Sequence, residues 1–166
     1  MPVFRILCAF FVLTLVGAAQ APAPKPAGTL AQVMRGILFP NSNILFDVQT
    51  RDPETFGKKE EGSGASSTFS GIYTGWQVVE NAAIALDEAT RLLTVPGRLC
   101  ENGRPVPLDQ KDWPQFVSEL RTASQTMLKA AQAKNRELAS EVTNDVATAC
   151  ENCHSKYRDA TPRCTP

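Results

Sequence analysis

Apolar residues recur at three- and four-residue steps along most of this chain, the spacing of amphipathic helices, and no stretch alternates with the period of a strand. The first helical stretch begins at Thr29, which forms a capping box with Gln32. Pro40 is expected to break or kink it, and Asn43 to Gln49 to resume it. Its apolar face consists of Leu30, Met34, Ile37 and Leu38.

The next two amphipathic stretches predict two long helices. One runs from about 69 to 95 and is stopped by Pro96 and Gly97. The other is capped by Asp112 and carries Pro114 in its first turn, a position that proline favours. The expected inner positions are Ile72, Trp76, Val79, Ala83, Leu86 and Leu93 in the former, and Phe116, Leu120, Ala123, Met127 and Ala130 in the latter.

A fourth helix is expected from Asn135 to about Asp159, with Leu138, Val142, Val146 and Ala149 as its inner positions. The polar, glycine- and serine-rich segment 51–68 is expected to be a mobile surface loop. Four such helices predict an all-α fold, an antiparallel bundle of four helices in up-down-up-down order.

The N-terminal residues have the pattern of a secretory signal, expected at 1–19. Arg5 supplies the positive start, 6–16 the apolar run and 17–19 a small-residue cleavage site. The apolar run is short for a transmembrane helix, although an uncleaved anchor is the alternative. Residues 20–28, rich in proline and alanine, are expected to form a flexible tether, which leaves 29–166 as one domain.

Charge excludes two classes of partner. Without Arg5, 16 of the 17 basic residues remain against 17 acidic ones, and no basic cluster stands out. Binding to nucleic acid or to an anionic membrane surface is therefore not expected, nor is stable membrane insertion once the signal is removed.

The chemistry is concentrated in Cys150-Glu151-Asn152-Cys153-His154, a Cys-x-x-Cys-His signature of c-type haem attachment. Two thiols one helical turn apart reach the two vinyl groups of one porphyrin, and the adjacent imidazole ligates the iron. His154 is the only histidine in the chain. A zinc site would need a second Cys/His cluster, and a thioredoxin-like pair would need a strand–helix unit; the sequence shows neither.

A signal, four helices and Cys-x-x-Cys-His-x-x-Tyr-Arg near the C-terminus resemble the class II cytochromes c, that is, the cytochrome c′ group and its low-spin relatives. The resemblance implies one covalent haem c in a periplasmic protein. In the high-spin members an apolar side chain covers an open iron position, whereas in the low-spin members a methionine of the first helix fills it. It also implies a role near the haem for Arg158, which follows the proximal histidine, and a homodimer as one option.

Met34 is the expected distal ligand. In the predicted topology the start of the first helix and the end of the fourth share one end. At 1.5 Å per residue, Met34 lies roughly 8 Å from that end and the motif roughly 8–14 Å. Met127, roughly 21 Å from that end, is expected in the core. If Met34 turns away, Leu30, Ile37 or Leu38 would cover the iron. Arg35, Arg98 and Arg104 are candidate partners for the haem propionates.

Two functions follow from these alternatives. A His/Met-ligated iron fits a periplasmic electron carrier that exchanges electrons with redox partner proteins. A vacant apolar position would instead bind nitric oxide or carbon monoxide. No catalytic constellation accompanies the motif, so an enzyme is not expected.

Cys100 and Cys164 are expected to form a disulfide. Each lies a few residues beyond a helix that ends at the same end of the predicted bundle, and an exported protein meets oxidising conditions. The alternatives are two unrelated loop cysteines, or a bridge between two protomers.

Overall fold

The computed structural model describes residues 25–57, 73–159 and 164, and over these ranges the protein is all-α. An isolated antiparallel bridge pairs Leu99 with Pro105, and there is no strand in the described ranges. The expected signal at 1–19, most of the tether, the loop from residue 58 onward and Ile72 lie outside the described residues.

The first helical path runs from α1 (Leu30–Val33) through the π-helical turn η1 (Met34–Leu38) into α2 (Phe39–Asp47). The predicted capping box is confirmed: the Gln32 N–H donates to Oγ1 of Thr29 at 3.2 Å, and the Thr29 N–H to Oε1 of Gln32 at 2.8 Å. Pro40 does not break the path, because the helix widens into a π turn just before it. A short 3₁₀ turn, η2 (Pro53–Thr55), follows.

The second predicted helix begins later than expected, at Trp76 rather than near residue 69. α3 (Trp76–Ala89) continues as the 3₁₀ segment η4 (Thr90–Thr94), so the helical path still ends just before Pro96. Its start follows from Gly75, which has φ +62°, outside the helical region, and whose N–H donates to the carbonyl of Phe56 at 2.8 Å. All the expected inner positions in the described part are buried: Trp76, Val79, Ala83, Leu86 and Leu93.

The other two helices are α4 (Trp113–Gln132) and α5 (Arg136–Tyr157). Pro114 lies in the first turn of α4 as predicted, but the Asp112 side chain does not cap that helix. Asn135 does cap α5, with its side chain accepting from the Leu138 N–H at 3.0 Å.

One predicted core position of α5 is wrong. Leu138 is 37% exposed, whereas its neighbour Ala139 is fully buried. The other three inner positions, Val142, Val146 and Ala149, are buried as expected.

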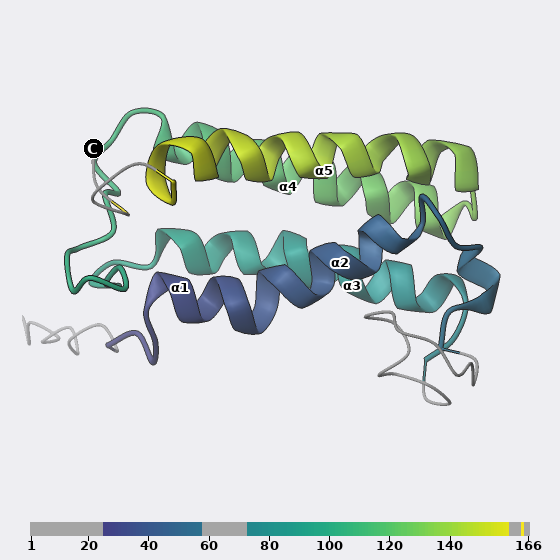
Figure 1. The fold of residues 1–166 in the computed structure, drawn as a ribbon, viewed down its shortest axis with the longest axis horizontal. Helices are drawn as coiled ribbons and strands as arrows, with labels where there is room; N and C mark the ends of the chain where they lie inside the picture. Colours follow the sequence, from purple (N-terminus) through teal and green to yellow (C-terminus); the bar gives the residue numbers. More distant parts are fainter. Residues whose placement is uncertain (1–24, 58–72, 160–163, 165–166) are drawn as a thin grey trace, which may run out of the picture.

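Figure 1 shows α4 and α5 lying side by side, with α3 packed along α4 and the α1–η1–α2 path packed along α3. The start of α1, the start of α4 and the end of α5 lie at the same end, where the loop between η4 and α4 also lies (Figure 1). This shared end positions the residues of the candidate site. None of the described helices combines the length and the apolar character needed to cross a membrane.

Candidate functional site

A cavity of about 310 Å³ opens at the end of the molecule where α1 and α4 start and α5 ends. Every described helix from α1 to α5, together with η1 and η4, contributes to the wall, and Cys100 and Cys164 add to it from outside the helices. Its volume lies at the lower end of the range of small-molecule pockets, and its lining is largely apolar. Apolar wall positions include Leu30, Leu38, Leu86, Leu93, Val117 and Leu120.

The three chemically active residues of the motif line this cavity together. Cys150, Cys153 and His154 lie on the last turns of α5, and all three are partly buried. Residues three apart on a helix have Cβ atoms about 5–6 Å apart on one face. Both thiols are free, so both are available for covalent chemistry at the same wall.

The environment disfavours the charged forms of these groups. Burial raises the pKa of the Cys150 thiol, and it raises the pKa of Cys153 to about 12, with Cys150 and nearby carboxylates adding to the effect. Burial, and next the positive charge of Arg158, lower the pKa of His154. A neutral imidazole is the form that ligates a metal.

Met34 contributes to the cavity wall from the η1 side, between Leu30 and Leu38. It is partly buried, and the π turn begins at this residue. Met127 is fully buried in the core and does not line the cavity. Of the two methionines in the described ranges, only Met34 therefore faces the same space as the cysteines and the histidine.

Arg158 is placed beside His154. Its Nη1 lies 3.0 Å from Nδ1 of the imidazole, and its Nε donates to Asp159 at 2.7 Å. Because a guanidinium can only donate, Nδ1 accepts here, and the ring proton of the neutral imidazole is then on Nε2. Arg158 also lines the cavity.

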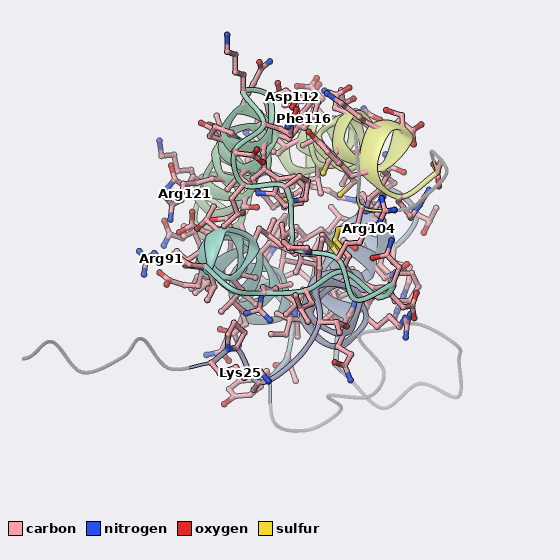
Figure 2. All side chains as sticks on the ribbon, turned by 90° about the vertical axis from the view of Figure 1, so that its left-hand side faces the viewer. Lys25, Arg91, Arg104, Asp112, Phe116 and Arg121 are labelled. Atoms are coloured by element: carbon pink, nitrogen blue, oxygen red, sulfur yellow. A yellow bond between two sulfur atoms is a disulfide. The ribbon has the colours of Figure 1, made fainter. Side chains whose placement is uncertain are left out.

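The three other candidate arginines differ in their positions. Arg35 lines the cavity and forms an ion pair with Glu101. Arg98 does not line the cavity: it is buried, and it donates to the carbonyls of Leu92 at 3.0 Å and Gly28 at 2.6 Å. Arg104 is exposed and does not line the cavity, although it lies at the same end of the molecule (Figure 2).

Sequence reasoning missed an aromatic wall. The rings of Trp113 and Tyr157 meet edge to face at 4.9 Å between centroids, and Phe116 meets Tyr157 at 6.2 Å. All three line the cavity, and Figure 2 shows Phe116 near Asp112, on the side where α5 ends. The available signal was the spacing of Tyr157, one turn after His154, together with the aromatic residues opening α4.

Asp112 joins the start of α4 to the end of α5. It accepts from the hydroxyl of Tyr157 at 2.6 Å and forms an ion pair with Lys156. These bonds, first that of Lys156 and then that of Tyr157, lower the pKa of Asp112. Burial, and then the bond to Asp112, raise the pKa of Tyr157. The side chain expected to cap α4 thus holds the aromatic wall in place.

The predicted disulfide between Cys100 and Cys164 is confirmed, with the two Cα atoms 5.8 Å apart. Both residues are buried and line the cavity. The Cys164 N–H also donates to the carbonyl of Tyr157 at 2.5 Å. Cys164 is therefore tied both to the loop after η4 and to the end of α5.

The donor set of the cavity suits a preformed cofactor better than a bare ion. Within the described ranges, no group of three or more His, Cys, Asp and Glu side chains is arranged to hold a metal ion. What the cavity offers is one imidazole, one thioether sulfur and two thiols on an apolar wall. No protein-family model, no curated protein and no solved structure matches this chain.

Proposed function

We propose that this chain is a c-type cytochrome that carries one covalently bound haem and transfers electrons in the periplasm. The observation that carries the proposal is the meeting of Cys150, Cys153, His154 and Met34 at one apolar cavity. The motif alone would permit a surface location for the two thiols. Their partly buried position beside an imidazole, with a thioether in the same wall, is what a ligated porphyrin requires.

Each residue has a separate role in the proposal. Cys150 and Cys153 would hold the haem covalently: addition of each S–H group across one vinyl group would form a thioether and leave no by-product. His154 would be the proximal ligand through Nε2, and Nδ1 would then carry the ring proton. Arg158, which can only donate, would lie beside the ligated ring without bonding Nδ1. Met34 is the distal ligand, and Trp113, Phe116 and Tyr157 exclude water from the cavity.

Haem would supply a one-electron couple at its iron, and a thioether ligand favours the ferrous state. The chain contributes a fixed environment. The walls are largely helical, and the disulfide together with the Asp112 bonds holds the end of α5 in place. An electron carrier needs little reorganisation between oxidation states, and this fixed wall supplies that property.

The finer architecture belongs to the same proposal. We infer an antiparallel, up-down-up-down four-helix bundle of the class II cytochrome kind, with the α1–η1–α2 path as its first helix. The neighbours α3 with α4 and α4 with α5 support this order, as does the shared end of the first and last helices. A redox partner protein and, as an option, a homodimer follow from the class.

Two measurements test the proposal on the protein produced with its export signal in a host that attaches haem c. Under denaturing conditions the mass should exceed that of the mature chain by one haem. The absorption spectrum should be low-spin in both oxidation states and should not change when carbon monoxide is added to the reduced protein. A high-spin spectrum that carbon monoxide shifts would support instead a binder of diatomic gases. The absence of covalent haem would overturn both functions.

A further inference from the structure

The π turn η1 lies at the point where the first helical path forms the cavity wall. Its register is shown by the Phe39 N–H, which donates to the carbonyl of Met34, five residues earlier. π turns are rare in helices and concentrate at functional sites. Here the turn begins at the one methionine that lines the cavity.

The spacing of the wall residues explains what the turn does. Leu30, Met34, Leu38 and Ser42 all line the cavity, at a constant step of four. An α-helix turns about 100° per residue, so each step of four drifts by about 40°, or about 120° over the three steps. The wider π turn rotates less per residue and removes part of this drift. Without it, residues on one side of the turn would leave the cavity wall.

The sequence supplies a cause for the turn at Pro40. Proline has no N–H to donate, and in an α-helix its ring clashes with the carbonyl four residues earlier, here that of Gly36. A π turn moves that carbonyl away from the ring. Side-chain amides then bond nearby carbonyls: Asn41 donates to Ile37 at 2.7 Å, and Asn43 to Phe39 at 2.7 Å.

We propose that Pro40 is a positioning residue, which imposes the π turn and thereby sets the rotation of Met34 into the cavity. This inference rests on the proposed function in that Met34 is taken as the distal ligand. Pro40 acts through the backbone. Replacing it with alanine restores an N–H and removes the ring, so the segment relaxes to α-helix and Met34 rotates away from the iron.

Gly36 allows a rescue and a control. A π turn amounts to one extra residue in an α-helix, so deleting one residue from a relaxed segment restores the original rotation of both flanks. Gly36 is exposed and has no side chain, so deleting it removes no side-chain contact. A Cβ added at Gly36 meets nothing within 4 Å, so an alanine is accommodated there. Gly36→Ala keeps Pro40 and the residue count, and it should behave like the unaltered protein.

The experiment compares four haem-loaded proteins: unaltered, Pro40→Ala, Pro40→Ala with Gly36 deleted, and Gly36→Ala. We expect loss of the low-spin spectrum and gain of carbon monoxide binding in Pro40→Ala, return of the low-spin spectrum in the deletion variant, and no change in Gly36→Ala. Circular dichroism checks that each variant folds. A fully low-spin Pro40→Ala protein would overturn the inference and leave the proposed function standing. So would a high-spin deletion variant that is folded.

A second readout does not depend on haem. Backbone amide chemical shifts of residues 34–38 should change from π-helical to α-helical values in Pro40→Ala, with or without the cofactor. If no haem is attached to the unaltered protein, the proposed function fails, and these shifts alone decide whether Pro40 imposes the turn. Unchanged chemical shifts in Pro40→Ala would overturn the inference that Pro40 imposes the π turn.

Discussion

Met34 lies in the cavity wall between Leu30 and Leu38, so its loss removes the thioether and leaves two apolar neighbours that cannot ligate iron. Met34→Ala should convert the spectrum from low-spin to high-spin and allow carbon monoxide to bind the reduced protein. Absorption spectroscopy of both oxidation states measures the change.

Met127 provides the matched control, because it is fully buried and does not line the cavity. Met127→Leu conserves volume and should cost less than about 1.5 kcal/mol of unfolding free energy, with an unchanged spectrum. A low-spin Met34→Ala protein would disprove the ligand assignment.

The two motif thiols act as a pair on one face of α5. Cys150→Ser or Cys153→Ser should leave one thioether, and the double variant none, so that haem is extracted by acidified organic solvent. Haem staining after denaturing electrophoresis measures the attachment. Haem retained by the double variant would contradict the attachment mode.

At the scale of elements, Asp112 connects the start of α4 to the end of α5 through Tyr157 and Lys156. Its pKa is lowered in the folded state, so the stability it contributes is present above its ordinary value of 3.8 and is lost as the pH falls through the lower, folded value. Asp112→Asn should therefore be less stable than the unaltered protein at pH 7, and the difference should shrink as the pH is taken below that ordinary value. Denaturant unfolding at several pH values measures it.

Asp109 is an exposed carboxylate of the same loop and serves as the control. Asp109→Asn should leave the unfolding free energy at pH 7 unchanged. The argument would fail if Asp112→Asn were as stable as the unaltered protein at pH 7.

The face of α5 gives a second prediction at this scale. Leu138 is partly exposed and Ala139 is fully buried. Leu138→Ala should change the unfolding free energy by less than about 0.5 kcal/mol. Ala139→Leu should destabilise by about 1–3 kcal/mol, because the packed core has no room for the added carbons. The reverse order of the two effects would show that the helix is rotated.

These elements show which features of the fold could be predicted from the sequence. Local signals were sufficient for the capping box of α1, the proline in the first turn of α4 and the start of α5 after Asn135. They failed where a distant contact decided the outcome. The bond from Gly75 to Phe56 sets the start of α3, and the bonds of Asp112 to the end of α5 divert it from capping. The predicted burial of Leu138 was wrong because periodicity cannot distinguish between adjacent positions at the edge of the apolar face of a helix.

The candidate site followed the same rule. The motif residues and Met34 could be identified because their spacing carries the chemistry, and the structure places them at one cavity. The aromatic wall, the π turn and the burial of Arg98 could not be predicted, because each depends on how separate segments meet.

At the scale of the whole molecule, the Cys100–Cys164 bond joins residues 64 apart in the sequence. Closing such a loop in the unfolded chain corresponds to about 4 kcal/mol in the chain-entropy model. The double variant Cys100→Ser/Cys164→Ser should therefore unfold at a lower denaturant concentration. Its unfolding free energy should be lower by about 2–4 kcal/mol.

Mass spectrometry of the unreduced, alkylated protein is the direct test of the bond. Neither Cys100 nor Cys164 should carry a label. Labelling of both, or a covalent dimer that a reductant separates, would rule out the internal bridge.

The same bond has a consequence for the order of maturation. Four cysteines from Cys100 onward allow three ways of forming two disulfides, and only one of them contains the Cys100–Cys164 pair. Once Cys150 and Cys153 are consumed as thioethers, no wrong pairing remains among these four cysteines. In the proposed cytochrome, early haem attachment therefore prevents incorrect disulfides from forming during oxidative folding. If the chain is oxidised before haem is attached, Cys100 and Cys164 can each pair incorrectly with Cys150 or Cys153.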